Sequence, residues 1–240
     1  MKIAVIGDLH CGSERSGFIR TLLSGVEKEA DMLALAGDLT NTGMIQEMEV
    51  LLDELKFFGG PIAAVLGNHD HEQNHTELLV KMMESRGVCV LDRSSCVVGG
   101  VGFFGTKGFC GGFGNRRIQP FGEYAIKAFV QAGVNEVMAM EQALVELSTP
   151  IKVGLLHYAP IRATLQGESP ELFPFLGTSL MADVLDRHNV TVAFHGHAHN
   201  GALHGHTPGN VPVFNVSRFA REQAGKKPYK LYDVSGKESA

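Results

Sequence analysis

Two patterns of apolar and polar residues alternate along the first third of the chain. Short apolar runs, each followed at once by glycine and then by aspartate or asparagine, occupy residues 3–6, 32–36 and 62–66. After each run, apolar residues recur every three or four positions, as in a helix with one buried face. These stretches cover residues 18–26, 44–55 and 78–83. Three successive units of strand, loop and helix predict parallel strands joined by crossover helices.

The pattern changes after a fourth apolar run at residues 88–91. Two short runs that are split by glycine, residues 96–98 and 101–104, predict a hairpin, and we expect a second sheet to start there. Residues 105–114 contain five glycines and are predicted to form a loop.

The last part of the chain returns to helices and strands. Helical spacing covers residues 124–147, where Gly133 is expected to separate two helices. A further helix is predicted at about residues 177–187. Apolar runs predict strands at residues 153–156, 191–194 and 211–216.

The length and composition favour one globular domain over residues 1–240. No internal repeat or Pro/Ser-rich linker divides the 240 residues, and 44% hydrophobic with 20% charged residues is ordinary for a globular protein. No segment approaches the roughly 18 consecutive apolar residues that a membrane helix needs. The apolar run at residues 3–6 is too short for the core of a signal peptide. We therefore expect a cytoplasmic protein without a membrane partner.

The formal net charge of −5 disfavours a general nucleic-acid binder, whose phosphate contacts need a surplus of lysine and arginine. A small phosphate ester remains compatible with this charge, because bound metal ions can reverse the sign of an acidic site. The sequence leaves the oligomeric state open.

Side chains that commonly bind metals directly follow five predicted strands. They are Asp8 and His10, Asp38, Asn68 and His69, His157, and His197 and His199. Ligands of open α/β sheets bind at the carboxyl ends of the strands, so these segments should converge on one crevice. Residues two apart, as in each aspartate–histidine or histidine–histidine pair, can point the same way and chelate one ion. Carboxylate, imidazole and amide ligands without thiolate suit Mn, Fe, Co or Zn.

The order of these residues resembles the signature of the calcineurin-like metallophosphoesterases. The family's motifs appear between residues 7 and 199 as DLH, GD, GNHD, a lone His157 and GHAH. Any one motif is weak evidence, whereas all five in order after predicted strands are far rarer. The resemblance implies an α/β fold, a four-layer α/β/β/α sandwich of two mixed β-sheets flanked by helices.

The resemblance also implies a dinuclear metal centre and a phosphoric ester hydrolase. One divalent ion (Mn, Fe, Zn or Co) would be held by Asp8, His10 and His199, the other by Asn68, His157 and His197, with Asp38 bridging them. The ions would lie about 3.5–4 Å apart and share a hydroxide that attacks phosphorus in line. The expected function is hydrolysis of phosphomonoesters or small phosphodiesters.

His69 has a separate role in this interpretation. The resemblance implies that it faces the leaving group and protonates the departing oxygen or stabilises its charge. Asp70 would orient the ring through its other nitrogen. The alternative is that His69 is a third ligand of the second metal.

Several further side chains are candidates for substrate contacts. Arg116, Arg117 and Arg162 could clamp a phosphate bidentately, with solvated surface residues as the alternative. His75 and His204 could line the substrate pocket or lie in solvated loops. His195 shares its strand phase with His197, which favours a supporting or packing role over metal binding.

Two other functions compete with phosphate-ester hydrolysis. A non-catalytic metal-binding or interaction protein could keep the same fold without the chemistry, although the full set of ligand-type residues argues against it. A nuclease would need a basic stripe, which the sequence lacks.

Overall fold

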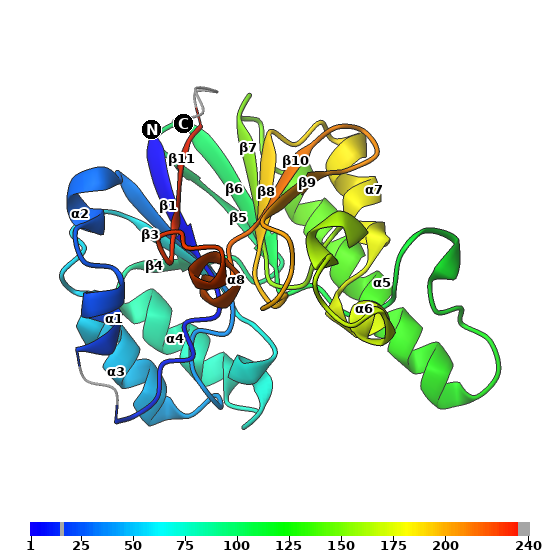
Figure 1. The fold of residues 1–240 in the computed structure, drawn as a ribbon, viewed down its shortest axis with the longest axis horizontal. Coiled ribbons are helices and arrows are strands. Elements are labelled where there is room, and N and C mark those ends of the chain that lie inside the picture. Colours follow the sequence, from blue (N-terminus) through cyan, green and yellow to red (C-terminus); the bar gives the residue numbers. More distant parts are fainter. Residues whose placement is uncertain (15–16, 235–240) are drawn as a thin grey trace.

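The computed structural model describes residues 1–14 and 17–234, which form two β-sheets packed face to face (Figure 1). The first sheet has the strand order β11-β1-β2-β3-β4. Its strands are β1 (Lys2–Ile6), β2 (Met32–Ala36), β3 (Ile62–Val65), β4 (Val88–Val90) and β11 (Lys230–Asp233). Strands β1 to β4 are parallel, and β11 pairs with β1 in the antiparallel direction.

The second sheet is also mixed and has the order β5-β6-β7-β8-β10-β9. Its strands are β5 (Ser94–Val98), β6 (Val101–Thr106), β7 (Lys152–Leu156), β8 (Val192–His195), β9 (His204–His206) and β10 (Pro212–Asn215). The inner strands β6, β7, β8 and β10 run in parallel, whereas the edge strands β5 and β9 are antiparallel to their neighbours.

Helices cover the outer faces of both sheets (Figure 1). The first sheet carries α1 (Phe18–Leu22), α2 (Val26–Glu29), α3 (Ile45–Leu55) and α4 (Thr76–Ser85). The second carries α5 (Tyr124–Val145) and α7 (Ser179–Arg187). The remaining helices are α6 (Phe173–Leu176), α8 (Arg218–Gln223) and the 3-10 turns His69–His71, Gly114–Arg116, Arg162–Leu165 and Pro170–Leu172. The predicted four-layer α/β/β/α sandwich is confirmed.

The alternation of side chains along each strand builds three apolar layers. Ile3 and Val5 of β1 point into the layer between the sheets, while Ala4 and Ile6 point toward the helices. Phe103, Phe194 and Phe214 from the second sheet fill the central layer. Both faces of the inner strands are therefore buried, which holds the strand ends in fixed positions.

The predicted break at Gly133 is wrong, because α5 is continuous from Tyr124 to Val145. A side chain at position 133 would place its Cβ 3.1 Å from the carbonyl oxygen of Cys110, so the glycine allows close packing. Gly105 likewise lies within β6, which extends into the predicted loop, and a Cβ there would lie 2.7 Å from the Leu155 carbonyl oxygen.

Other elements differ from the predictions at the two ends of the chain. The helical stretch at residues 18–26 is split into α1 and α2 by Gly25, whose φ angle of 86° is left-handed. The sequence pattern did not predict β9, α8 or β11. Among the described residues, no helix has the length and apolar character needed to cross a membrane.

Replacement of Phe103 by alanine should destabilise the protein by about 3–5 kcal/mol, because the ring is fully buried between the sheets. Urea unfolding measures this change. Val97→Ala on the neighbouring strand β5 is the control, since that side chain is 56% exposed and should change the free energy of unfolding by well under 1 kcal/mol. Equal effects of the two substitutions would contradict the assigned core.

Candidate metal centre

The carboxyl ends of strands from both sheets bring two groups of ligand-type side chains together. The first group comprises Asp8, His10, Asp38 and His199, and the second comprises Asp38, His157 and His197. Within each group, one ligand atom of every residue lies within 4.8 Å of the others. Asp38 belongs to both groups, so its carboxylate could contact an ion held by either group.

Asn68 completes the second group with an amide oxygen. Its Oδ1 lies 2.9 Å from Nε2 of His157, and that nitrogen lies 3.3 Å from Oδ1 of Asp38. All seven residues that the sequence analysis assigned to metals therefore lie together, in two groups that have Asp38 in common. Carboxylate, imidazole and amide atoms of this kind are suitable ligands for divalent transition metals.

The surroundings of Asp38 leave little room for movement of its carboxylate. The residue is 1% exposed, and its Oδ1 accepts a hydrogen bond of 2.9 Å from the backbone N–H of His69. A Cβ at Gly67 would lie 2.1 Å from this same oxygen. The glycine is required because the backbone passes directly over the carboxylate.

His10 provides a direct test of whether these residues fit a metal. Its Nε2 is buried and has no hydrogen-bond partner within the described part of the chain. The nearest acidic atom is Oδ2 of Asp38 at 3.8 Å, beyond hydrogen-bond distance. A buried polar nitrogen without a partner is costly, and a metal ion between it and the carboxylate would satisfy both groups.

The backbone at the site adopts conformations that side chains other than glycine seldom occupy. Asp8, His10, Asp38 and His197 have φ angles of 60°, 46°, 47° and 66°, in the left-handed region. Each such residue costs on the order of 1 kcal/mol, and such strain concentrates at functional sites. The turns direct these four side chains toward one another.

Opposite charges dominate the electrostatics of the metal-free second group. Burial lowers the pKa of His157, but the nearby Asp38 carboxylate outweighs this and raises it to about 9. Burial raises the pKa of Asp38, but the charge of His157 and the hydrogen bonds to the carboxylate together lower it by more, so the net shift is downward. Both ring nitrogens of His157 face oxygen acceptors, Ala36 O at 3.0 Å and Asn68 Oδ1 at 2.9 Å, as expected for the protonated ring.

The pKa values of the other histidines in the two groups shift in different directions. Burial lowers the pKa of His10 to about 4 and that of His197 to about 3, so both rings are neutral near pH 7 and can serve as ligands. Burial also lowers the pKa of His199, but its hydrogen bond to Asp8, with Nε2 and Oδ1 3.2 Å apart, shifts the net value upward.

Comparison with known proteins agrees with this arrangement. The family model described as calcineurin-like phosphoesterase matches residues 1–201. The chain belongs to this phosphoesterase family. A comparison with curated proteins finds no match.

Solved structures share the fold of this family member at low sequence identity. Phosphopantetheinyl hydrolase from Mycobacterium tuberculosis superposes with a TM-score of 0.69 at 18% identity, covering 96% of this chain and 95% of the other. The protein TT1561 of Thermus thermophilus gives a TM-score of 0.54 at 14% identity, covering 97% and 98% of the two chains. At these identities the likeness concerns the fold alone.

The prediction that Asp70 orients the ring of His69 is wrong for this phosphoesterase. Nδ1 of His69 lies 2.8 Å from the carbonyl oxygen of Asn41, to which it can donate. The buried Asp70 carboxylate instead accepts hydrogen bonds from the backbone N–H groups of Leu39, Thr40 and Gly67 and from the Thr40 hydroxyl. Asp70 therefore joins the loop after β2 to the loop after β3, and burial, with the charge of Asp38, raises its pKa to about 6.

His69 lies at the outer side of the two groups. Its Nε2 is 4.0 Å from Oδ2 of Asp38, and its side chain is 38% exposed, whereas that of His157 is fully buried. The ring also meets the ring of His10 edge-on, with centroids 4.6 Å apart. His69 can thus approach a ligand that enters from solvent.

The candidate substrate contacts do not gather around the metal centre. Arg116, Arg117 and Arg162 line a cavity of about 740 Å³ whose lining contains none of the seven ligand-type residues. Arg117 also forms an ion pair with Asp183 at 3.3 Å. His204 lines a different cavity, and His75 is exposed at the start of α4.

His195 is fully buried and packed within the structure, as the sequence favoured. Its Nε2 lies 2.8 Å from the Thr164 hydroxyl, and its Nδ1 lies 2.7 Å from the carbonyl oxygen of Gly196. Both ring nitrogens are thus engaged away from the two ligand groups. Burial lowers its pKa to about 4.

Sequence reasoning missed the residues that α8 contributes. Nε of the buried Arg218 donates a hydrogen bond of 2.9 Å to the backbone carbonyl of Asp8. The ring of Phe219 packs against that of His199, with centroids 4.5 Å apart. Arg218 and Phe219 come shortly after β10, just as the ligand-type residues come directly after other strands. Their position after the predicted strand at residues 211–216 could therefore have marked them as neighbours of the site.

The pKa of His157 predicts how the metal-free protein responds to pH. The value of about 9 lies above the unfolded value of 6.5, so the interaction stabilises the fold fully below pH 6.5 and is lost as pH rises through 9. The shift corresponds to about 3 kcal/mol. Urea unfolding of EDTA-treated protein should show this loss relative to His157→Asn; parallel pH profiles for the two proteins would contradict it.

Proposed function

We propose that the chain is a dinuclear metal-dependent phosphoesterase that hydrolyses phosphomonoesters or small phosphodiesters. The observation that carries this proposal is the shared position of Asp38 between two groups of ligand-type side chains. The Nε2 atom of His10 supports it, because this buried nitrogen has no hydrogen-bond partner within the described residues. Family membership places the chain among phosphoesterases.

The proposed ligands divide between two ions. Asp8, His10 and His199 would hold the first, Asn68, His157 and His197 would hold the second, and Asp38 would serve both. Two divalent ions activate a shared water and neutralise the phosphoryl oxygens in such sites. Since His157 is protonated in the metal-free protein near pH 7, it must release its proton before it can act as a ligand.

His69 is proposed to serve the leaving group. Its exposed edge allows Nε2, which lies 4.0 Å from Oδ2 of Asp38, to approach the departing oxygen, while the Asn41 carbonyl fixes the ring through Nδ1. Because Nδ1 donates to that carbonyl, a proton given from Nε2 leaves a neutral ring that keeps its orientation. This positioning replaces the role that the sequence had assigned to Asp70.

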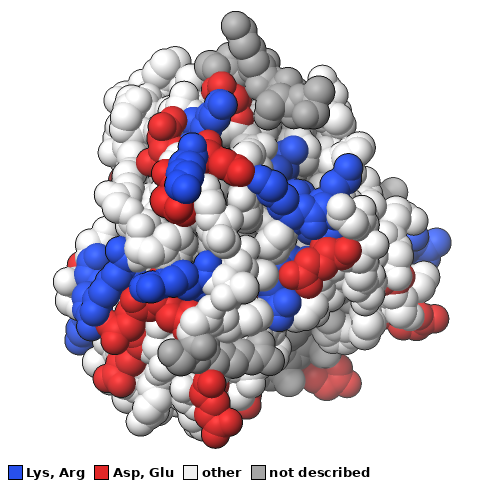
Figure 2. Space-filling view, turned by 60° about the vertical axis from the view of Figure 1, so that its left-hand side comes forward, with Lys and Arg blue, Asp and Glu red and all other residues white. Residues whose placement is uncertain are grey.

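The charge distribution supports a small substrate rather than a long nucleic acid. Figure 2 shows acidic side chains beside the basic ones, without a continuous basic field on that face. A duplex would need such a field to neutralise successive phosphates. A single phosphate group needs only the local positive charge that two divalent ions would supply to the two aspartates.

Asp38→Asn should remove metal from both positions, because it weakens a ligand that both ions share. The loss of metal affinity should exceed the roughly 10–100-fold that removal of an outer-shell partner causes. Mass spectrometry of the metal content after gel filtration measures the change. Asp53→Asn on α3 has the same change in charge at an exposed residue and should keep both ions. Full metal content and turnover in Asp38→Asn would refute the bridging role.

His69→Ala should keep both ions and lose turnover by about 10²–10⁴-fold. The loss should be larger for phenyl phosphate than for p-nitrophenyl phosphate, because a good leaving group needs less help from an acid. Steady-state kinetics with both substrates, together with the metal content, provide the test. Loss of one ion, or an equal loss for both substrates, would show that His69 is a ligand or a structural residue instead.

A further inference from the structure

The histidine pair proposed for the first ion packs against an aromatic ring from a distant part of the chain. The rings of His10 and His199 lie 5.5 Å apart, and the ring of Phe219 meets them at centroid distances of 5.7 Å and 4.5 Å. We call these three side chains the first ring cluster. They come from the loop after β1, the loop after β8 and helix α8, so the cluster joins three separate segments.

The histidine pair proposed for the second ion is arranged in the same way. The rings of His157 and His197 lie 4.9 Å apart, and the ring of Tyr158 meets them at centroid distances of 5.6 Å and 4.3 Å. We call these side chains the second ring cluster. In the part of the chain that the structure describes, no ring contact joins the two clusters. Each histidine pair therefore has an aromatic neighbour of its own.

The two clusters differ in how else their histidine rings are held. Rotation of a histidine ring about its last torsion angle is soft unless its nitrogens or its faces are held. In the second cluster, Nδ1 of His157 and Nε2 of His197 lie 3.0 Å and 3.4 Å from backbone carbonyl oxygens. In the first, Nε2 of His10 has no hydrogen-bond partner within the described residues, and Nε2 of His199 contacts the carboxylate of Asp8, which is itself a proposed ligand. The first pair thus depends more on ring packing.

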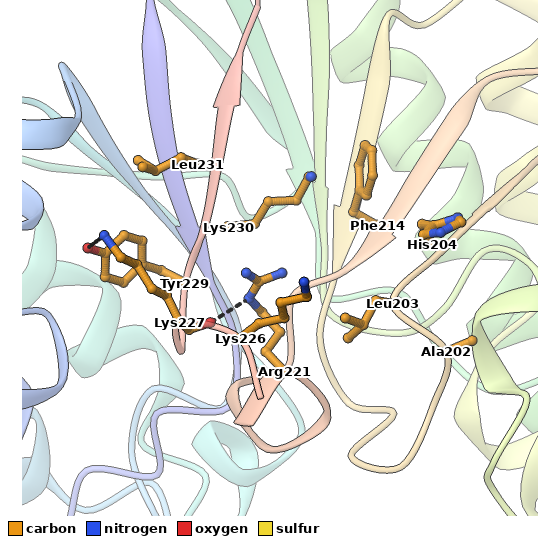
Figure 3. Close-up of a pocket in the computed structure, with 10 residues that line it drawn as sticks. All are labelled: Ala202, Leu203, His204, Phe214, Arg221, Lys226, Lys227, Tyr229, Lys230 and Leu231. Carbon is orange, nitrogen blue, oxygen red and sulfur yellow. Dashed lines mark hydrogen bonds between the residues drawn. The ribbon is translucent and has the colours of Figure 1, made fainter. Parts of the chain in front are cut away.

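Helix α8 holds Phe219 in place through contacts on both sides of it. The guanidinium carbon of Arg218 lies 3.9 Å from the ring centroid of Phe219, and Nε of the same arginine donates a hydrogen bond of 2.9 Å to the Asp8 carbonyl. Further along the helix, Nε of Arg221 donates a hydrogen bond of 2.9 Å to the carbonyl oxygen of Lys227 (Figure 3). The helix is therefore fixed both to the site and to the loop that follows it.

We propose that Phe219 is a positioning residue for the first ion and Tyr158 for the second, so that each ring sets the affinity of one ion. The inference rests on the proposed dinuclear site and goes beyond it, because α8 lies outside residues 1–201 that the family model matches. Loss of one aromatic ring lets the two histidines beside it rotate and admits water to them, which weakens metal binding. The other pair keeps its own ring and its affinity.

Zinc titration of the chelator-treated full chain, in competition with a chromogenic chelator, reports the number of bound ions and the affinity of each. Phe219→Leu should weaken one ion about tenfold or more and leave the other unchanged. Tyr158→Leu should weaken the other ion by a smaller factor, because hydrogen bonds also hold its histidines. Tyr158→Phe keeps the ring and should keep both affinities. Phe57→Leu, at a half-buried phenylalanine beside the helices of the first sheet, is the matched control and should also keep both.

Proteins with only one intact histidine pair identify which ion is affected. His197→Ala leaves the ligands of the first ion, and His10→Ala leaves those of the second. Phe219→Leu should weaken zinc binding in the His197→Ala protein and not in the His10→Ala protein, and Tyr158→Leu should do the reverse. Equal losses in the two proteins, or no loss in either, would overturn the proposal.

Because zinc binding is measured without turnover, the proposal and the proposed function can fail separately. Selective loss of one ion, in a protein whose wild type cleaves no phosphate ester, would support the role of the rings and count against the hydrolysis. Hydrolysis by a wild type with two ions, neither of which responds to loss of its ring, would overturn the role of the rings alone.

A folding defect is distinguished by urea unfolding of the metal-free variants. Loss of both ions from Phe219→Leu, in a protein that unfolds at the same urea concentration as the wild type, would contradict the separate roles of the rings. Phe219→Met keeps an apolar, flexible side chain and takes the place of the leucine variant if the latter unfolds earlier. Retention of the second ion by either variant shows that the fold is intact and supports the proposal.

Discussion

The carboxylate of Asp38 is buried among ligand-type atoms that come from both sheets. Within 4 Å of its two oxygens lie nitrogen atoms of His10, His69 and His157, which follow β1, β3 and β7. In water these groups would be separated and individually hydrated, whereas here the packed sheets hold them together. Burial of this carboxylate is unfavourable, and the surrounding loops offset the loss of its hydration. The His69 N–H donates a hydrogen bond to it, the protonated His157 supplies an opposite charge, and Gly67 lets the backbone pass close by.

The two sheets are what make this arrangement possible. Buried phenylalanines between them fix the distance between β1, β2 and β3 on one side and β7 and β8 on the other. The ligand-bearing turns can therefore hold left-handed conformations at Asp8, His10, Asp38 and His197, which an isolated turn would relax. The strained turns thus depend on the rigid sheets, because ligand side chains are held in place only when the elements that carry them do not move.

Much of this organisation was predictable from the sequence. Apolar runs that end in glycine and then aspartate or asparagine located β1, β2 and β3, and the ligand-type residues after the strands located the crevice. Glycine was misleading where it serves close packing rather than a turn, as at Gly105 and Gly133. The spacing of apolar residues within a segment does not reveal which distant segment of the chain will pack its backbone against a given glycine.

The partners of polar groups were the least predictable feature. Asp70 follows His69 directly, and yet its carboxylate joins two loops, because the 3-10 turn at His69–His71 directs adjacent side chains apart. The residues after β10 were overlooked because arginine and phenylalanine are not metal ligands, although Arg218 and Phe219 support Asp8 and His199.

The central claim is that two metal ions share the Asp38 carboxylate. Anomalous diffraction from crystals grown with Mn²⁺ tests it most directly, because it locates the ions without reference to activity. We expect two anomalous peaks about 3.5–4 Å apart, one on each side of this carboxylate. A single peak, or two peaks that do not both contact Asp38, would contradict it.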